Sequence, residues 1–568
     1  MKRLRWQLVV VVITLAVIVL LLLSQQQGVL PGIVDPVVQP TSGGAYSEAL
    51  IGSLQRLNPV LDWYNTPDQD VNRLLYCSLM SFDERALPAG DVIETWGISA
   101  DGTVYNFSIR DNAIWHDGEP VTSEDVVYTT GLLADPELPA PDDLKGLWAA
   151  IDIVPLDDKT FQMILPEPFA PFLDYLTFGL LPAHLLDGVT AAELVDDEFN
   201  LDPVGCGPYR YEQLLVTDGA ISGVVLSTFP EYYAQPAYIE EVTFKTYPDA
   251  ADALLAYQTG EVLGVAELTP ETLVEGLQST ELNLYTGRLP RLELILFNLN
   301  DPGLPFLQDS ALRQALLLGM NRQRIIDRLL GGQAIPAVGP IFPGTWAYYE
   351  NMPQYAYDPE RALNLLKLEG YNLAAGDSSL RAKEGEPALE FELIHPDQAP
   401  YPAIAAAIQE DWAHLGVKIT LTALPYSELV SEHLETREFA AALVDLDFTG
   451  QHDPDPYAFW HDTQATSGQN YTQWADRQAS EYLEQARIRD DYGERARLYR
   501  NFQVRFANEL PALPLFYPVY SYGIDQSIQG ASIGSLTEPN DRLTTLPAWF
   551  LESRLTAPTA APEITATP

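Results

Sequence analysis

A helix pattern that passes directly into a strand pattern limits the possible folds of this chain more than any other feature. The segment PAIAAAIQEDWAHLG is predicted to form a helix that ends at Gly416, and residues 417–421 follow at once as a strand. Residues 242–246 and 292–298 are also strand-like. Helix-then-strand units of this kind, mixed with hairpins, indicate an α/β or α+β fold and not an all-α or all-β one.

Two further helices have recognisable ends. Asp358 and Pro359 supply a cap and a first-turn proline for the helix in ERALNLLKLEG, which Gly370 closes. Ser310 is predicted to cap one long helix, ALRQALLLGMNRQRIIDRLLGG, in which apolar residues recur at helical spacing. These ends place helices between the strands of the mixed pattern.

The segment YNFSIRDNAIWHDGEPVTSEDVVYT, residues 105–129, combines a strand, a turn and a capped helix. Apolar and polar residues alternate at its start, which is the pattern of a half-buried strand. Asp117 and Gly118 supply the turn, and Thr122 lies three residues before an aspartate, a spacing that suits a helix cap. His116 beside this turn is interpreted as a hydrogen-bonding residue of the turn and not as a catalytic group.

The length and composition indicate a chain of several interleaved parts. A chain of 568 residues is too long for one core and should form two or three domains. Its 44 prolines and 37 glycines are spread throughout, so no change of composition marks a domain boundary. Residues 25–43 are expected to be a spacer, and residues 551–568, rich in Thr, Ala and Pro, a disordered tail.

The first residues predict export. Three basic residues among the first five precede an apolar run over residues 8–23 that only Thr14 interrupts. As a helix this run would span about 24 Å, less than the roughly 30 Å of a bilayer core. Residues 1–24 are therefore a cleaved signal or a membrane anchor, and the lack of a convincing cleavage site favours the anchor. The charge before this segment places the rest of the chain outside the cytoplasm.

The chain contains two cysteines, Cys77 and Cys206. Two cysteines are too few for a disulfide scaffold or a structural zinc site. In an exported protein they could form a single bridge, and the alternative is that both are small buried residues.

The charge balance and the motifs argue against several classes of function. The chain has 32 basic and 79 acidic residues, a net charge of −47, so its surface repels nucleic acid and anionic lipid headgroups. It has no G-x-S-x-G, P-loop or G-x-G-x-x-G motif, and its seven histidines are scattered. We therefore expect no nucleic-acid partner, no catalytic residues, no cofactor and no metal site. A hydrolase using His452, Asp453 or Asp455 stays as an alternative.

Aromatic residues cluster among polar turn residues in GTWAYYE, YAFWHD and GQNYTQW. Rings on loops between structured elements suit the wall of a concave site for a soluble ligand. Each ring could equally pack in a core.

Ordered segments of the chain resemble one known family. The segment ETWGISADGTVYNFSIRDNAIWHDGEPVTSEDVVYT is similar to the signature region of family 5 extracellular solute-binding proteins, the peptide- and nickel-type receptors of ABC importers. The similarity covers residues 44–550, and Cys206 stands where the family has threonine. The other similar segments, in the family's order, are ALIGSLQRLNPVLD, QDVNRLLYCSLMSFDE, LPEPFAPFLDYLTFGLLPAHLL, PVGCGPYR, RQALLLGMNRQRII, YDPERALNLLKLEGY and ELPALPLFYPVY.

The resemblance implies a fold and a layout of domains. The fold would be α/β and two-lobed, like that of type II periplasmic binding proteins, with an extra α+β domain and hinged closure on ligand. Lobe I would be discontinuous and consist of residues 44–57, 185–290 and 505–550. The extra domain would take residues 58–184, and lobe II residues 291–504. A discontinuous lobe would explain why composition marks no boundary.

The resemblance also implies ligand-binding positions. Peptide-binding relatives hold the α-ammonium of the ligand on an aspartate just upstream of an acidic-Pro step in lobe II. Here that step is Asp453-Pro454, and Gly450 occupies the expected anchor position. Three nearby aspartates could replace the anchor, because a buried ammonium needs a paired carboxylate. With the aromatic candidates and a polar-aromatic segment that lies close to the cleft in relatives, we predict the ligand-binding residues Trp346, Asp447, Asp453, Asp455, Trp460, Asn470 and Tyr471.

The function implied by the resemblance is that of a receptor. We expect an extracytoplasmic, non-catalytic and monomeric protein, located in the periplasm or on the outer face of the membrane. It would capture an oligopeptide or a similar small solute and deliver it to the permease subunits of an ABC importer. The alternatives are an anchored sensory ectodomain that presents its ligand to a signalling partner and, less favoured, the extracellular hydrolase.

Overall fold

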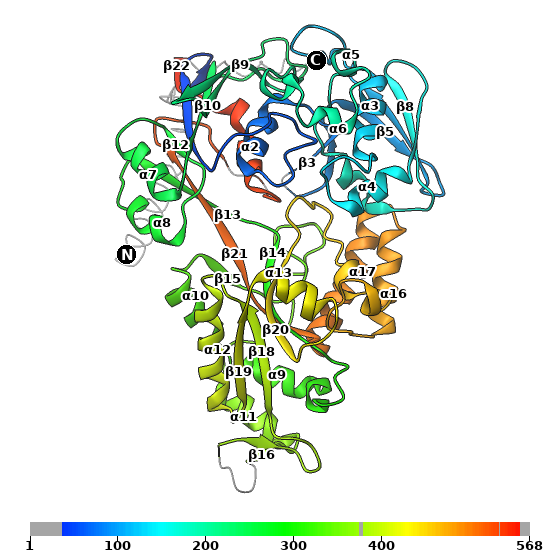
Figure 1. The fold of residues 1–568 in the computed structure, drawn as a ribbon, viewed down its shortest axis with the longest axis vertical. Coiled ribbons are helices and arrows are strands. Elements are labelled where there is room, and N and C mark those ends of the chain that lie inside the picture. Colours follow the sequence, from blue (N-terminus) through cyan, green and yellow to red (C-terminus); the bar gives the residue numbers. More distant parts are fainter. Residues whose placement is uncertain (1–36, 84, 374–378, 533, 535, 557–568) are drawn as a thin grey trace, which may run out of the picture.

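The computed structural model describes residues 37–556 except 84, 374–378, 533 and 535. The chain forms an upper half and a lower half that long strands connect (Figure 1). The upper half contains residues 37–288 and 519–556, and the lower half residues 291–516. The predicted signal or anchor, residues 1–24, lies outside the described residues. None of the helices within the described ranges is both long enough and apolar enough to cross a membrane.

One sheet runs through both halves. Its strand order is β19-β18-β20-β14-β21-β12-β2-β11-β10-β9, and β13 and β15 pair with β21 beside this path. The strand β21 (Ala512–Asp525) pairs with β14 in the lower half and with β12 and β13 in the upper half. The chain therefore passes between the halves within β21 and also between β13 (Leu282–Arg288) and β14 (Arg291–Phe297).

The lower half is a sheet with a hydrophobic core on each face. Along β14, Ile295 and Phe297 point into one core, while Leu294 and Leu296 point into the other. A strand covered on both faces is apolar at successive positions, as β14 is from Leu294 to Phe297. Its neighbours are β15 (Ala334–Pro336), β18 (Glu390–Pro396), β19 (Lys418–Leu424) and β20 (Ala441–Asp447). One face of the sheet is covered by α9 (Ser310–Gly319), α10 (Arg322–Leu329), α11 (Pro359–Leu368) and α12 (Tyr401–His414). The other face is covered by α16 (Arg477–Arg487) and α17 (Tyr492–Glu509).

The upper half combines the other end of the long sheet with a four-stranded antiparallel sheet, and one continuous core extends through both. The long sheet contributes β2 (Ala45–Ile51), β9 (Tyr209–Thr217), β10 (Ala220–Thr228), β11 (Glu241–Tyr247) and β12 (Gly264–Val265), with α7 (Ala250–Gln258) and α8 (Pro270–Gly276) beside it. The smaller sheet has the order β5-β6-β8-β7 and consists of β5 (Ile93–Ile98), β6 (Val104–Ile109), β7 (Asp152–Pro155) and β8 (Thr160–Ile164), accompanied by α3 (Ser123–Leu133) and α4 (Asp142–Ala149).

Several sequence predictions of local structure are confirmed. The strand predicted at the start of residues 105–129 is β6, and the predicted helix is α3, where the Thr122 backbone N–H donates to Asp125 Oδ2 at 2.7 Å. Asp358 accepts from the backbone of Arg361 and caps α11, as expected. The α/β class is therefore correct, and helix and strand ends follow the capping and turn residues of the sequence.

The helix predicted after Ser310 differs from the structure in two ways. The chain forms two helices, α9 and α10, because it turns at Met320 and begins again at Asn321, whose side chain accepts from the Arg324 backbone at 3.0 Å. The cap of α9 is Asp309, which accepts from the Ala311 backbone at 2.9 Å, and not Ser310. A second cap inside the apolar pattern marks the break.

His116 has a structural role, although not in the turn itself. Its Nδ1 accepts from the Gly205 backbone N–H at 3.2 Å, and its Nε2 lies 3.1 Å from the Gly207 carbonyl oxygen. The neighbouring Asp117 instead binds His184 at 2.8 Å. Burial lowers the pKa of His116 to about 4, so its ring is neutral and joins two segments of the upper half.

A disulfide bond joins Cys77 and Cys206, whose Cα atoms are 5.2 Å apart. It connects the end of α2 (Thr66–Leu75) to the segment before β9, two regions 129 residues apart in sequence. Gly205 allows this close approach, because a Cβ atom there would lie 1.9 Å from the Leu75 carbonyl oxygen.

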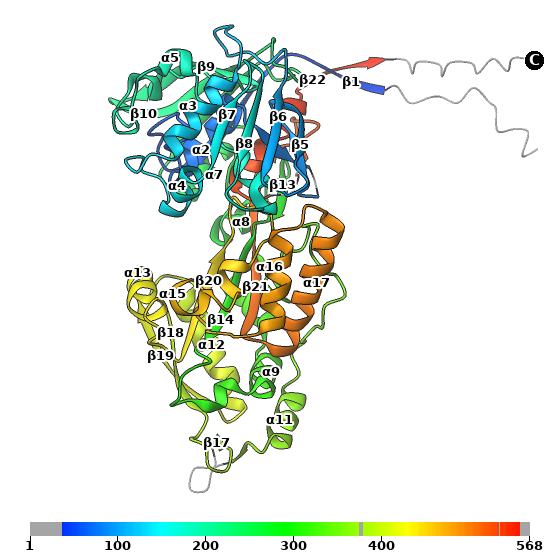
Figure 2. The same ribbon diagram turned by 90° about the vertical axis from the view of Figure 1, so that its right-hand side faces the viewer.

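Two expectations for the chain ends differ from the structure. The strand β1 (Val37–Thr41) pairs antiparallel with β22 (Glu552–Thr556), and Figure 2 shows this ribbon beside the upper half. These residues were expected in the spacer and the tail. In addition, α17 continues past the expected boundary at residue 505 and ends at Glu509 in the lower half. The remaining domain boundaries stay a prediction.

Candidate ligand-binding site

A cleft of about 740 Å³ lies between the two halves. The upper half supplies most of its wall, from α2, from residues 76–91 and 174–179, and from residues 538–547. The lower half closes it with Arg291 and residues 447–451, the loop after β20. A volume of several hundred Å³ between two bodies is typical of a site for a small ligand.

The floor of the cleft is formed by α2 and the short helix η6 (Pro539–Leu543). Arg542 of η6 connects this helix to α2 and to the sheet. Its guanidinium lies 2.5 Å from Asp70 Oδ1 on α2 and 2.5 Å from Glu48 Oε1 on β2. The Arg542 side chain is fully buried, and Tyr46 donates to the other oxygen of Glu48 at 2.5 Å. Because two carboxylates and one guanidinium are bonded together here, the floor has a fixed position relative to the sheet.

The charged groups of the cleft are mostly acidic. Its two arginines are each paired with an aspartate: Arg73 Nη2 lies 2.8 Å from Asp541 Oδ1, and Arg291 Nη2 lies 2.5 Å from Asp447 Oδ2. The carboxylates that line it are Asp62, Asp91, Asp174, Asp447 and Glu538. The cleft therefore has more negative than positive groups, and its cations already have partners.

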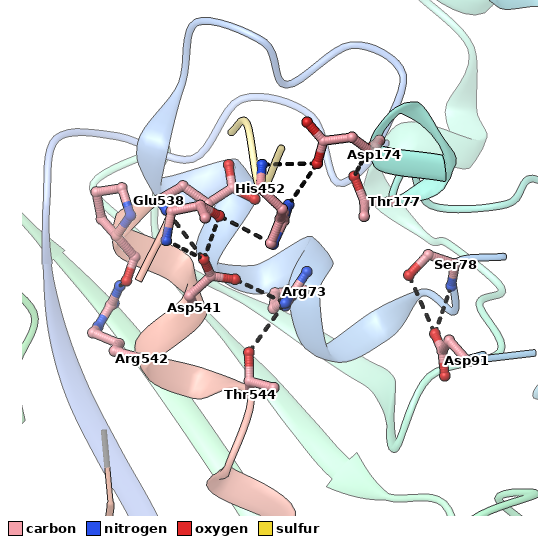
Figure 3. A network of polar contacts seen from close by, with 12 residues as sticks. Arg73, Ser78, Asp91, Asp174, Thr177, His452, Glu538, Asp541, Arg542 and Thr544 are labelled. Atoms are coloured by element: carbon pink, nitrogen blue, oxygen red, sulfur yellow. Dashed lines mark hydrogen bonds and ion pairs between the residues drawn. The ribbon is translucent and has the colours of Figure 1, made fainter. Parts of the chain in front are cut away.

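A polar network at the edge of the cleft joins the two halves (Figure 3). His452, in the loop after β20, lies with Nδ1 3.0 Å from Asp174 Oδ1 of η2 (Ala170–Leu176) and with Nε2 3.2 Å from Thr537 Oγ1. The Thr537 hydroxyl donates to Asp541 Oδ2 at 2.8 Å, and Asp541 binds Arg73. The network thus connects the lower-half loop to both α2 and η6.

Aromatic rings form much of the remaining wall. Trp148 is almost fully buried, yet its Nε1 makes no hydrogen bond to any described residue. Arg291 Nε likewise makes no hydrogen bond to a described residue, although it lies 3.7 Å from Asp445 Oδ2. The other rings that line the cleft are Trp63, Tyr76, Tyr175, Phe178 and Tyr232. The wall of the cleft therefore combines apolar surface with a few polar groups, as ligand sites commonly do.

The sequence matches the profile of "Bacterial extracellular solute-binding proteins, family 5 Middle" over residues 88–471, which is more than half of the chain. The chain belongs to this family. The family consists of binding proteins and not of enzymes, and its members are extracytoplasmic.

Characterised relatives span nearly the whole chain. A dipeptide-binding protein of Escherichia coli is 25% identical over 515 residues, which cover 85% of this chain and 91% of that protein. The oligopeptide-binding protein AppA of Bacillus subtilis is 23% identical over 90% of this chain and 92% of its own length. A di/tripeptide-binding protein of Pseudomonas aeruginosa is 28% identical over 80% of this chain and 85% of its own length.

Solved structures confirm the two-lobed type II fold. The structure of AppA from Bacillus subtilis with a nonapeptide superposes with a TM-score of 0.65 at 22% identity, covering 90% of this chain and all of that one. The unliganded open form of the murein tripeptide-binding protein MppA has a TM-score of 0.75 at 19% identity, covering 91% of this chain and 98% of that one. The discontinuous first lobe implied by the resemblance belongs to this fold.

Of the seven predicted ligand-binding residues of this family member, Asp447 is the one that lines the cleft. Asp447 is paired with Arg291. Burial raises the pKa of Asp447, but hydrogen bonds from Thr449 and the charge of Arg291 lower it by more, so the net change is a decrease. Gly450, the expected anchor position three residues later, also lines the cleft. The lower-half loop that the resemblance indicated therefore does face the cavity.

The other two predicted aspartates hold the loop in place. Asp453 is buried and lies 2.7 Å from Arg495 on α17, while Asp455 lies 2.6 Å from Arg487 on α16. His452 faces Asp174 instead. The three groups of the hydrolase alternative thus bind three different partners and do not converge on one position. Among the described residues, no group of three His, Cys, Asp or Glu side chains could hold a metal ion.

The predicted aromatic and amide residues pack within the lower half. Trp346 lies against Arg495, 4.9 Å from its guanidinium carbon, and Trp460 is buried against Phe506. Asn470 is fully buried, and its amide binds the backbone of Trp474. Tyr471 stacks on Arg437 at 4.9 Å. None of the four lines the cleft of the described chain, and their role in binding stays a prediction.

Sequence reasoning missed the residues of the cleft floor. Asp62, Asn72 and Arg73 are separated from Glu538 and Asn540 by more than 460 positions, and none belongs to a recognisable motif. The only available signal was that LNPVLD and QDVNRLL fall within segments similar to the family.

Proposed function

We propose that this protein is the extracytoplasmic substrate-binding receptor of an ABC importer and that its ligand is a short peptide. The relatives named above bind dipeptides, di/tripeptides or oligopeptides. A protein of the same fold from Helicobacter pylori, an ABC transporter-associated periplasmic binding protein, holds the peptide STSA. A monomer would deliver its ligand, chemically unchanged, to the permease subunits.

The observation that carries this proposal is the pairing of unused acceptors and unused donors in one cleft. Asn72 Oδ1 and Asn540 Oδ1 are acceptors, and Trp148 Nε1 and Arg291 Nε are donors, each without a hydrogen bond to the described residues. A buried polar atom without a partner is costly, so a ligand that supplies both donors and acceptors stabilises the site. A peptide has an ammonium group, a carboxylate and backbone amides, and therefore meets both demands.

The connections between the halves support closure around the ligand. The chain crosses between the halves at residues 289–290 and within β21, and the cleft lies beside these crossings. Two adjacent crossings allow one half to rotate against the other with small changes in a few residues. We propose that ligand binding closes the cleft by such a rotation.

A library of dipeptides, tripeptides and longer peptides tests the proposal by thermal unfolding. A ligand that binds the folded state alone stabilises it by about 2.7 kcal/mol at a concentration of 100 times its Kd. We expect at least one peptide class to raise the Tm by several degrees. An unchanged Tm across the whole library, with a rise for sugars or metal chelates instead, would contradict the peptide ligand.

The N-terminal segment favours one alternative, an anchored sensory ectodomain. An uncleaved anchor would hold the receptor on the outer face of the membrane, which suits delivery to a permease as well as signalling. Co-purification with permease subunits after mild detergent extraction supports the importer. Co-purification with a signalling protein in place of a permease supports the sensory role.

A further inference from the structure

Two carboxyl–amide pairs lie at one end of the cleft floor. Asp62 Oδ2 accepts a hydrogen bond from Asn72 Nδ2 on α2 at 2.8 Å. Asn540 on η6 lies close enough to Glu538 for its side-chain amide to lower the pKa of that carboxyl. All four side chains line the cleft, and the charges of Asp62 and Glu538 are close enough to influence one another. The two pairs therefore form one cluster, which we call the acceptor cluster.

The amide oxygens of the acceptor cluster are unused. Asn72 is 4% exposed and Asn540 is 5% exposed, and the Oδ1 atom of each has no hydrogen-bond partner among the described residues. The Asn72 amide has already used an N–H group on Asp62, so rotating this amide would only move the deficit to its nitrogen. Because buried acceptors are almost always satisfied in folded proteins, these two atoms indicate donors supplied from outside.

The carboxyl groups of the acceptor cluster have no directly bonded cation among the described residues. Within the described part of the chain neither Asp62 nor Glu538 forms an ion pair, since the two arginines of the cleft are bound to Asp541 and Asp447. Burial and the charge of Glu538 raise the pKa of Asp62 well above its usual range. Burial and the charge of Asp541 raise the pKa of Glu538 to about 7, although the charges of Arg73 and His452 lower it. A ligand cation would favour the charged form of both carboxyl groups.

We propose that the acceptor cluster binds a nitrogen-centred cation of the ligand, an ammonium or a guanidinium group. Such a group has three to five N–H donors, which match two carboxylates and two amide oxygens. A metal ion fits less well, because the described residues contain no set of three His, Cys, Asp or Glu side chains that could coordinate one. The cation comes from a peptide N-terminus or from a basic side chain, and in this respect the inference rests on the proposed function.

Isothermal titration calorimetry of the full chain with five small ligands tests the inference. The ligands are Ala-Ala, N-acetyl-Ala-Ala, N-acetyl-Lys-Ala, Lys-Ala and the free diamine putrescine. We expect the cationic peptides to bind at least tenfold more tightly than N-acetyl-Ala-Ala. A comparison of Ala-Ala with N-acetyl-Lys-Ala then shows whether the α-ammonium or the side chain occupies the acceptor cluster.

Two conservative variants assign the effect to the acceptor cluster. Asp62→Asn and Glu538→Gln remove one charge each and keep the shape of the side chain. We expect each to weaken binding of the cationic ligands about tenfold and to leave N-acetyl-Ala-Ala unaffected. The Tm of the ligand-free variants should not fall, because burial opposes the charged form of each carboxyl group and the substitution puts a neutral amide in its place. Asp152→Asn, on the exposed edge strand β7, makes the same charge change far from the cleft and should bind as the wild type does.

The outcomes separate this inference from the proposed function. Peptides that bind wild type and both variants with equal affinity would overturn the cation site and leave the peptide receptor standing. Putrescine binding that both variants lose, without any peptide binding, would overturn the peptide receptor and uphold the cation site. Binding of none of the five ligands would overturn both.

Discussion

Nδ1 of His452 lies 3.0 Å from Oδ1 of Asp174, and this contact joins the lower-half loop to the upper half across the edge of the cleft. The other ring nitrogen faces Thr537 Oγ1, whose own proton goes to Asp541. A carboxylate accepts only, and the Thr537 hydroxyl has no second proton to give. With the Thr537 proton on Asp541, both ring nitrogens of His452 face acceptors, and this arrangement favours the imidazolium.

We expect the contact between the halves to depend on pH. Burial and the charge of Arg73 lower the pKa of His452. The hydrogen bond and charge of Asp174 and the charge of Asp541 outweigh them, so the pKa is raised overall. A raised pKa in the folded state stabilises the protein fully below the unfolded value of about 6.5, and this stabilisation is lost as pH rises through the folded pKa. The Tm difference between wild type and His452→Asn should shrink between pH 6 and 9.

Glu538 faces the same network and titrates near pH 7, so the measurement needs a control. Repeating the comparison in a Glu538→Gln background removes that group while leaving Asp174, Asp541 and Arg73 in place. A Tm difference that stays constant with pH in both backgrounds would contradict a charged His452.

The buried triad of Arg542, Glu48 and Asp70 should be essential for the cleft floor. We expect Arg542→Met to lower the free energy of unfolding by about 3–5 kcal/mol, because two buried carboxylates lose their cation. Urea denaturation measures this change. The matched control is Arg210→Met, whose partner Glu212 is exposed and whose loss should cost less than about 1 kcal/mol. A similar loss of unfolding free energy in both variants would contradict the expectation that a buried ion pair matters more for stability than an exposed one.

The disulfide bond should stabilise the upper half. It closes a loop of 129 residues, and cross-links of that length contribute about 4–5 kcal/mol in the chain-entropy treatment. We expect a reductant to lower the Tm, and the double variant Cys77→Ser/Cys206→Ser to have the same low Tm with or without it. Titration of the denatured protein should detect two thiols after reduction and none before. Equal thiol numbers in both states would contradict the bond.

Filling the cleft should prevent binding without disturbing the fold. Thr449 is exposed, lies on the lower-half loop and lines the cleft. We expect Thr449→Trp to weaken peptide binding at least tenfold, because the larger side chain occupies ligand space, while the Tm of the ligand-free protein stays within a few degrees. Unchanged peptide affinity in this variant would place the ligand elsewhere in the molecule.

Local structure could be predicted well from the sequence where it depends on capping residues and periodicity over short distances. The strands β14 and β19 and the caps of α3 and α11 follow from residues within a few positions of each other. The strand β21 was not recognised, because Pro514 and Pro518 lie within it and proline is unusual in a central strand. Its pairing with several strands of both halves overrides that local preference.

The residues of the site were harder to predict from the sequence than the fold was. Asp453 and Asp455 were predicted to bind the ligand, and in the structure they pair with Arg495 and Arg487 on helices about 30 to 40 positions later in the chain. The acceptor cluster depends on α2 and η6 lying side by side, and only the folded chain brings residues 62–72 next to residues 538–540. Long-range pairing of this kind has no local signal in one sequence.

Native mass spectrometry of the full chain with Lys-Ala tests the central claim, a cleft that captures a peptide and releases it unchanged. We expect a complex of one peptide per chain that Asp62→Asn and Thr449→Trp both weaken, and a released peptide of the original mass. Free lysine and alanine after incubation with the wild type, or no complex with any peptide at concentrations well above the micromolar range, would contradict it.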